Sequence, residues 1–167
     1  MDELFATGQQ KRGINKGFLG ALIIGIVVVA GAVGYLLLRP SIDQQKAAIL
    51  AGSYQPGSAE YDELQKDIII STDPDTVQSP TGMGTISMFI KGRIRNKGTR
   101  TITALEVNVA VVSTFNEVLR QRRILVVPVQ QAQLGPGEII PITLTLDGFT
   151  KNDDRANIRW KVTAIRA

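Results

Sequence analysis

Cysteine and histidine are both absent from this sequence of 167 residues. Without cysteine the protein has no disulfide bond and no thiolate for catalysis or metal binding. Without histidine it lacks the most frequent general base of enzymes and the most frequent ligand of transition metals and haem. Asn-x-Ser/Thr glycosylation acceptors are missing as well. An exported domain without disulfides or glycan acceptors is more typical of bacteria than of animals.

The sequence also lacks the motifs that mark common enzyme classes. Serine and threonine are plentiful, but there is no histidine to activate them, no G-x-S-x-G motif and no glycine-rich phosphate loop. The pairs Asp73-x-Asp75 and Asp153-Asp154 fall in expected loops, and a calcium site needs six to eight oxygen ligands. We interpret these carboxylates as solvated turn residues. The sequence therefore predicts a protein that is not an enzyme, with no catalytic or cofactor-binding residue, no metal and no small-molecule substrate.

One long apolar run, residues 17–38, contains no charged side chain. At about 1.5 Å per residue a helix of this length covers roughly 33 Å, close to the ~30 Å hydrocarbon thickness of a bilayer. We therefore predict one transmembrane helix. A cleaved signal sequence is the alternative, because Ala30-Gly31-Ala32 resembles a cleavage site, although the apolar run continues through Leu38.

Basic residues flank the apolar run unequally. Lys11, Arg12 and Lys16 precede it, whereas only Arg39 follows it before Lys46. The positive-inside rule then places the N-terminus in the cytoplasm, where the three basic residues also lie near anionic lipid headgroups. We predict a single-pass protein of a bacterial inner membrane whose C-terminal domain is periplasmic.

Small residues recur along one face of the predicted helix. Gly17, Ala21 and Gly25 repeat every four residues, and Ala32 lies seven residues further on. Small residues let two helices approach closely in lipid, so this face is a candidate docking surface for other membrane-protein subunits. The general abundance of glycine in membrane spans explains the pattern equally well.

Beyond the span, helical signals give way to the period-two pattern of strands. Ser41 with Gln44 has capping-box spacing, and Ser58 precedes a short helix over residues 59–66. From residue 67 onward apolar and polar residues alternate, and a turn-rich loop is expected over residues 72–82. The predicted parts are a cytoplasmic tail (1–16), the transmembrane helix (17–38), a juxtamembrane helical stalk (39–66) and an extracytoplasmic β-domain (67–167).

The expected strands cover residues 68–70, 85–95, 105–112, 117–127, 140–146 and 157–165. Short antiparallel strands with no helical period among them predict a mainly β fold, an immunoglobulin-like sandwich of six or seven strands. Pro141 is expected on an edge or facing outward, because proline cannot donate to a strand ladder. Trp160 is expected in the core.

Several motifs of this domain resemble those of one known family. The segment IKGRIRNKG at residues 90–98 is followed by Ile102, by alternating apolar residues over 105–111, by Val118-Leu119, and by LGPGE at residues 134–138. This series is similar to the FxLyD family of immunoglobulin-like sandwiches, which pair a G-x-V-x-N strand end with a later L-x-PGE turn. The chain departs from that family at residues 114–117 (TFNE), because the family usually has a hydrophobic-Tyr-Asp sequence followed by a glycine turn and this segment lacks the glycine. The resemblance implies a binding or structural module of an exported or membrane-anchored protein.

Basic residues alternate along three of the expected strands and, by the phase that we assign to each strand, point away from the core. Residues 67–167 carry thirteen Lys or Arg against nine Asp or Glu. Such a surface suits lipid headgroups or an acidic partner, although charges on an outer face also protect strands from aggregation. Nucleic acid is not an expected partner. The predicted basic surface consists of Lys91, Arg93, Arg95, Arg120, Arg122, Arg159 and Lys161.

Two functions are consistent with these features. The first is a non-enzymatic accessory subunit that docks by its helix and its sandwich onto a larger membrane protein complex, for example a respiratory or photosynthetic electron-transfer complex. The second is a free-standing envelope protein whose sandwich binds a soluble ligand or a cell-wall component. The second predicts that residues 67–167 fold alone and that bulk at Ala21 and Gly25 is harmless.

Overall fold

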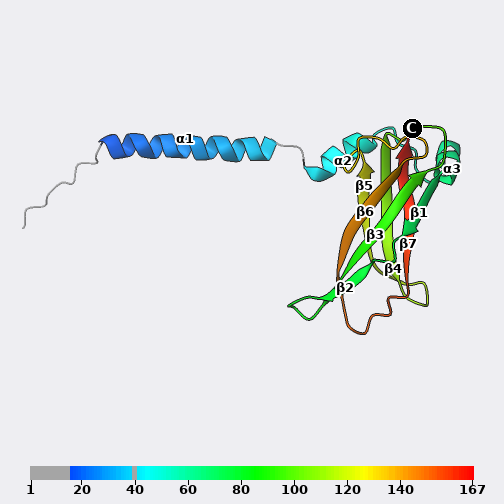
Figure 1. The fold of residues 1–167 in the computed structure, drawn as a ribbon. Coiled ribbons are helices and arrows are strands. Elements are labelled where there is room, and N and C mark those ends of the chain that lie inside the picture. Colours follow the sequence, from blue (N-terminus) through cyan, green and yellow to red (C-terminus); the bar gives the residue numbers. More distant parts are fainter. Residues whose placement is uncertain (1–15, 39–40) are drawn as a thin grey trace, which may run out of the picture. The chain divides into compact units, whose positions relative to one another are not determined.

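The computed structural model describes residues 16–38 and 41–167 (Figure 1). It forms two compact units, one ending at Gln44 and the other Gln45–Ala167, and each is considered by itself. The predicted tail residues Lys11 and Arg12 lie outside the described residues, and so does Arg39.

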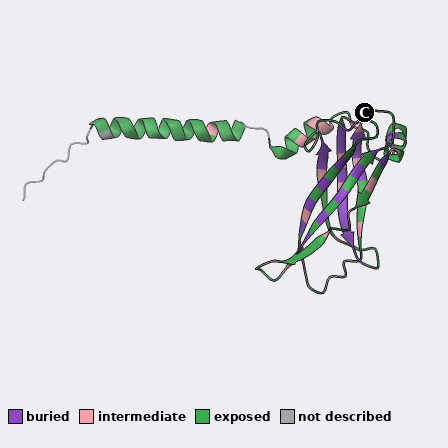
Figure 2. Ribbon diagram, in the orientation of Figure 1, coloured by how far each residue is buried: buried purple, intermediate pink, exposed green. Residues whose placement is uncertain are grey.

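Helix α1 (Lys16–Leu38) covers the predicted span and begins at the basic residue Lys16. Its large apolar side chains are exposed, from 44% at Leu19 to 85% at Leu38 (Figure 2). Side chains of this kind suit a lipid environment rather than water. By length and composition α1 is able to cross a membrane, and a cleaved signal sequence would meet the same criteria.

The two short helices form where their capping residues predict them. In α2 (Ile42–Leu50) the backbone N–H of Ser41 donates to Gln44 Oε1 at 3.0 Å, and the N–H of Gln44 donates to Ser41 Oγ at 3.2 Å. This reciprocal pair is a capping box. In α3 (Ala59–Lys66) the side chain of Ser58 accepts from the N–H of Tyr61. Both helix starts are therefore fixed by local sequence.

The remaining residues form a sandwich of two antiparallel sheets, so the predicted fold class is confirmed. In one sheet β3 (Ile86–Asn96) lies at the centre, with β6 (Ile139–Phe149) on one side and both β1 (Ile68–Thr72) and β2 (Val77–Pro80) on the other. In the other sheet β4 (Ala104–Val112) lies between β5 (Val118–Val127) and β7 (Asn157–Arg166). Pro141 lies in β6, an edge strand of the described sheet, as expected.

The expected loop over residues 72–82 was partly wrong, because β2 lies within it. Val77 pairs with Phe89 and Pro80 pairs with Ile86, which adds a short strand to the edge of β3. All four residues of β2 are exposed, so they carry no alternating apolar pattern. Pairing with β3 makes this a strand, and the sequence between turn formers gives no signal for it.

The core between the two sheets consists largely of the strand side chains that were predicted to point inward. Ile90, Ile94, Val107 and Val109 are fully buried. Trp160 is half-buried and packs against both parts of the core, while its indole N–H donates to Thr72 Oγ1 at 2.8 Å. The indole thus closes the side of the sandwich between β7 and β1.

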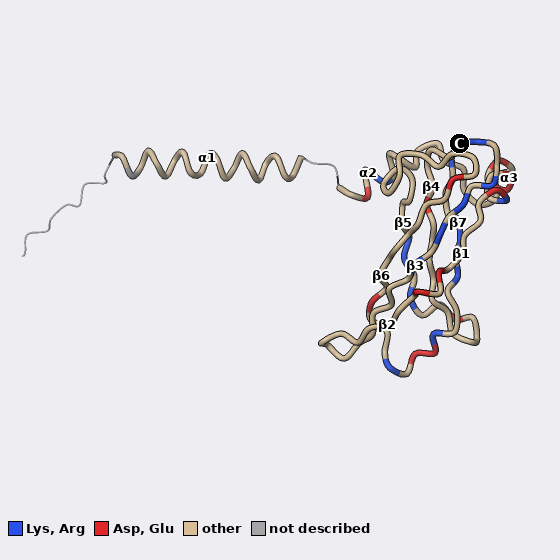
Figure 3. The backbone as a smooth tube through the Cα atoms, in the orientation of Figure 1, with Lys and Arg blue, Asp and Glu red and all other residues tan. Residues whose placement is uncertain are grey.

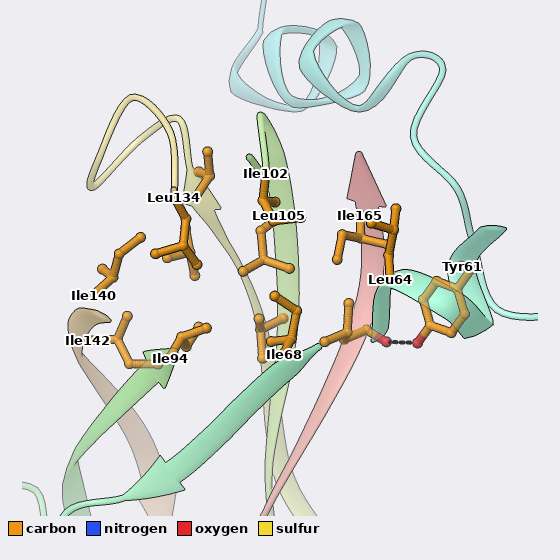
Figure 4. Close-up of a cluster of buried hydrophobic side chains, with 14 residues drawn as sticks. Tyr61, Leu64, Ile68, Ile94, Ile102, Leu105, Leu134, Ile140, Ile142 and Ile165 are labelled. Carbon is orange, nitrogen blue, oxygen red and sulfur yellow. Dashed lines mark hydrogen bonds between the residues drawn. The ribbon is translucent and has the colours of Figure 1, made fainter. Parts of the chain in front are cut away.

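Helix α3 belongs to this core, so the prediction that residues 59–66 form part of a separate stalk was wrong. Tyr61 is 2% exposed and Leu64 is 1% exposed. Leu64 lies among core side chains such as Ile165, and the hydroxyl of Tyr61 donates to the carbonyl of Val162 at 2.6 Å (Figure 4). Tyr61 and Leu64 lie about one turn apart on the same side of an otherwise polar helix. They are buried because β1 and β7 lie beside them.

The two motifs that carry the FxLyD resemblance meet in space. Asn96 is 1% exposed, and its amide donates to the carbonyls of Arg100 at 2.7 Å and Leu134 at 3.1 Å. The N–H of Gly137 donates to the carbonyl of Asn96 at 2.7 Å, and the N–H of Asn96 donates to the carbonyl of Glu138. These motifs therefore have a structural role, because they tie the end of β3 to the turn before β6.

The hairpin between β4 and β5 closes without a glycine. Asn116 adopts φ 65°, a left-handed conformation that asparagine tolerates better than most residues. The N–H of Ser113 donates to the carbonyl of Glu117 at 2.9 Å, and the N–H of Asn116 donates to Ser113 at 3.0 Å. Asn116 thus supplies the left-handed residue of this turn.

Candidate functional site

The predicted basic surface is not one patch. The two sheets turn their outer faces in opposite directions, and Figure 3 shows basic segments on strands of both sheets. The seven predicted residues fall into three groups, which the cross-strand register identifies. Lys91, Arg93 and Arg95 lie on the central strand β3, and Arg159 and Lys161 lie on the outer face of β7. Arg120 and Arg122 lie at the open edge of the sandwich, between β5 and β6.

The β3 group forms a row of cations flanked by exposed apolar side chains. Arg95 lies opposite Ile69 on one side and Ile139 on the other, and these are 46% and 51% exposed. At the other end of the row, Phe89 pairs with Val77, and both are exposed. Residues directly opposite in antiparallel strands share one face of the sheet. This outer face, centred on β3, is called the β3 face below.

One cation of the β3 face, Arg93, forms an ion pair, and the other two form none with the described residues. Arg93 forms an ion pair of 2.8 Å with Asp73, which also accepts from the N–H of Asp75. The Asp75 hydrogen bond, then the hydrogen bond and charge of Arg93 and the charge of Lys91, lower the pKa of Asp73 below its usual range and outweigh the opposing effect of desolvation. The side chains of Lys91 and Arg95 make no hydrogen bond or ion pair with any residue that the structure describes.

The prediction that Arg120 and Arg122 point outward was wrong. Both lie opposite inward-facing residues of β4, Arg120 opposite Val111 and Arg122 opposite Val109. Their guanidinium groups span the open edge of the sandwich and donate to backbone carbonyls of β6, Arg120 to Gly148 at 2.6 Å and Arg122 to Thr145 at 3.4 Å. These two arginines therefore close the edge between β5 and β6.

Arg120 has a further packing role at that edge. Its guanidinium carbon lies 6.0 Å from the ring centroid of the fully buried Phe149, and that of Arg155 lies 5.8 Å from the same ring. Cations at this distance from an aromatic face are attracted by its electron density. We assign Arg120 to the structure of the edge rather than to a binding surface.

The outer face of β5–β4–β7 carries a cation, Arg123, that is not among the seven predicted basic residues. Arg123 lies opposite Asn108 of β4, and Lys161 of β7 lies opposite Asn108 from the other side. Arg123 and Lys161 line a pocket of about 320 Å³ that also contains Glu106. Arg159, two residues before Lys161, instead donates to Asn116 Oδ1 at 2.9 Å. The adjacent residues 124–127 are all apolar, so the sequence gives no alternation that would have placed Arg123 outward.

The small-residue stripe of α1 borders a shallow apolar groove. Ala21 and Gly25 line it together with Leu22, Val29 and Val33. Gly17 and Ala32, which were predicted for the same docking face, do not line this groove, and Ala30 does. The structure therefore brings two of the four predicted residues to one surface.

The carboxylate pairs of the loops are engaged as turn formers. Asp153 accepts hydrogen bonds from the backbone N–H and from the hydroxyl of Thr150. These bonds, the one from the N–H first, lower the pKa of Asp153. Asp154 accepts from the hydroxyl and the N–H of Thr114, which likewise lower the pKa of that carboxyl. Among the described residues no three acidic side chains come together as a metal site.

Comparisons with known proteins identify no family. No protein-family model matches the sequence, and no curated protein matches it. A Bordetella pertussis protein described as ApaA superposes on 48% of this chain and 67% of its own, with 24% identity and a TM-score of 0.37. The trimeric lipoprotein SadB of Salmonella enterica superposes on 90% of this chain and 74% of its own, with 16% identity and a TM-score of 0.35. At such low TM-scores neither likeness bears on function.

Proposed function

We propose that this chain is a non-enzymatic, single-pass accessory subunit that docks onto a larger membrane protein complex. Helix α1 spans a bacterial inner membrane with its N-terminus in the cytoplasm, and the sandwich lies on the periplasmic side. Only residues 39–41 separate α1 from α2 in the sequence, so the tether to the sandwich is short. The β3 face contacts an outer domain of the partner, and the groove of α1 receives one of its membrane helices.

The observation that carries this proposal is the mixture of side chains on the β3 face. The outer face of an isolated antiparallel sheet is normally polar, whereas here Ile69, Phe89 and Ile139 are exposed beside Lys91 and Arg95. Exposed apolar side chains grouped with arginine are typical of protein interfaces. The complementary partner surface is acidic and partly apolar, because Lys91 and Arg95 form no ion pair with any of the described residues.

Affinity purification of the tagged full chain from native membranes tests the sandwich contact. We expect partner subunits to co-purify with the natural chain and to be lost from K91E/R95E. The double variant R123E/K161E is the matched control, because it reverses two charges on the opposite sheet and should retain the partners. Equal loss from both variants, or recovery of the natural chain only as a monomer or homodimer, would contradict the proposal. Binding to anionic vesicles tests lipid as the ligand of this face. If K91E/R95E binds them as strongly as the natural chain does, lipid is excluded.

A second pair of variants tests the helix contact. Adding bulk in A21L/G25L should detach the partners, because side chains in the groove prevent close approach of a second helix. The control G20L/G31L adds similar bulk about 80–100° around the helix from Ala21, at positions that do not line the groove. If A21L/G25L keeps its partners, the helix serves only as a membrane anchor and the docking role of its groove is contradicted. The free-standing alternative likewise predicts that bulk at these two positions is harmless.

A further inference from the structure

A pocket on the outer face of β5–β4–β7 holds charges that the docking proposal does not use. It lies between this sheet and the segment that joins α2 to α3, and its volume is about 320 Å³. Leu50, Pro56 and Ala164 give it an apolar wall, and Glu106, Arg123 and Lys161 line it with charge. This volume is at the lower end of the range for ligand pockets, which begins near about 300 Å³.

The two cations of the pocket lie on either side of one β4 residue and are unpaired. Asn108 lies directly opposite both Arg123 and Lys161, so the two cations flank it on the same face. The amide of Asn108 donates to Gln121 Oε1 at 3.2 Å. Within the described parts of the chain, neither Arg123 nor Lys161 forms a side-chain hydrogen bond or an ion pair. An anion entering the pocket would be the first partner of either group.

The carboxylate of Glu106 adds a charge of opposite sign. Its Oε2 accepts from the hydroxyl of Thr163 at 2.5 Å, which fixes the side chain beside the pocket. Its Oε1 has no hydrogen-bond partner among the residues described. The pocket therefore presents two cations and one carboxylate with a free oxygen. A simple anion would leave Glu106 repelling it, and a simple amine would leave both cations unused.

We infer that this pocket binds a small zwitterion that carries a phosphate close to an ammonium group, the chemistry of phosphoethanolamine. The phosphate accepts hydrogen bonds from Arg123 and Lys161, and the ammonium donates to Glu106 Oε1. Charge-assisted hydrogen bonds of this kind are stronger than those between neutral groups. The pocket and the β3 face lie on opposite sheets, so this inference is independent of the proposed function.

Calorimetric titration of the full chain in maltoside micelles tests the inference, because the detergent carries neither phosphate nor amine. Phosphoethanolamine should bind at least about fivefold more tightly than inorganic phosphate, and ethanolamine alone should bind most weakly. R123Q and K161Q should each weaken phosphoethanolamine binding by about tenfold or more. E106Q should bring the affinities for phosphoethanolamine and phosphate to within about twofold of each other, since its amide oxygen still accepts from Thr163 but carries no charge.

Matched controls separate a built site from general charge. K91Q/R95Q removes the same charge as R123Q/K161Q from the other sheet and should change affinity by less than about twofold, because exposed charges at this distance are screened. E117Q is the corresponding control for E106Q. Unchanged Trp160 fluorescence shows that each variant is folded. Absence of phosphoethanolamine binding to the natural chain, or equal losses in K91Q/R95Q and R123Q/K161Q, would overturn the inference.

The same titration in nanodiscs distinguishes the two sources of the ligand. If the pocket takes a lipid headgroup, phosphatidylethanolamine in the disc competes, and soluble phosphoethanolamine should bind about tenfold more weakly than in micelles. If the ligand is a soluble molecule, the affinity in both environments should be equal. Either result supports the site and identifies the source of its ligand. The result that would count against the site is a loss of phosphoethanolamine affinity in nanodiscs that is as large for R123Q/K161Q as for the natural chain.

Discussion

Replacing Leu64 by alanine tests whether α3 belongs to the folded domain. Leu64 is 1% exposed, so the substitution removes three buried carbon atoms from the core. At about 0.8 kcal/mol for each buried carbon group, the transfer contribution is about 2.4 kcal/mol, and the cavity left behind brings the expected loss to about 3–4 kcal/mol. This is a large part of the ~5–15 kcal/mol by which a domain of this kind is stable. If α3 were a stalk outside the domain, the same substitution would cost almost nothing.

Urea unfolding of the full chain in maltoside micelles measures the effect. The single tryptophan, Trp160, packs against both parts of the core and reports unfolding of the sandwich alone. With a slope of about 2 kcal/mol per molar urea, L64A should lower the transition midpoint by about 1.5–2 M. The control Q65A changes the next, exposed residue of α3 and should stay within about 0.5 kcal/mol of the natural chain. If L64A unfolds within about 0.5 kcal/mol of the natural chain, α3 does not contribute to the core.

Two further changes test buried polar groups of the sandwich, again by unfolding in urea. N96A removes the side-chain hydrogen bonds to the carbonyls of Arg100 and Leu134 and to the N–H of Gly98, so it should lower the free energy of unfolding by about 2–4 kcal/mol. The control N108A, on the outer face, should lower it by less than about 1 kcal/mol. Equal effects of the two changes would contradict the structural role of Asn96. Burial, and to a smaller extent the charge of Asp62, raises the pKa of Tyr61 above 10.0. The protonated hydroxyl therefore makes its whole contribution to the free energy of unfolding below pH 10, and this contribution is lost as the pH rises through the pKa of the folded state. Y61F should be about 1–2 kcal/mol less stable at pH 7, because the carbonyl of Val162 loses its donor, and the gap should narrow above pH 10; a gap that stays constant with pH would refute the argument.

The strand periodicity predicted most of the architecture because alternation is a local property. Over β3 every second residue from Met88 to Ile94 is buried, and this phase could be assigned from the apolar pattern alone. The starts of α2 and α3 were predictable for the same reason, since Ser41 and Ser58 cap helices through bonds to residues three positions away.

The phase of β5 was not predictable with the same ease. Residues 124–127 are all apolar, so they do not indicate which side faces the core. The pairing with β4 slips near both ends of β5, which leaves Leu119 and Val126 as extra residues. A slip of one residue reverses the face of every side chain beyond it. The expected outward direction of Arg120 and Arg122 was wrong for this reason.

By itself the sequence determined the long apolar helix, the mainly β fold and the inward residues of its regular strands, because each depends on residues that are neighbours in the chain. Only the tertiary structure decided that Tyr61 and Leu64 enter the core, that the basic residues divide between opposite faces, and that Arg123, Lys161 and Glu106 share a pocket. These arrangements depend on which strands pair and which face each sheet turns to the other, and such long-range choices leave no periodic trace in the chain.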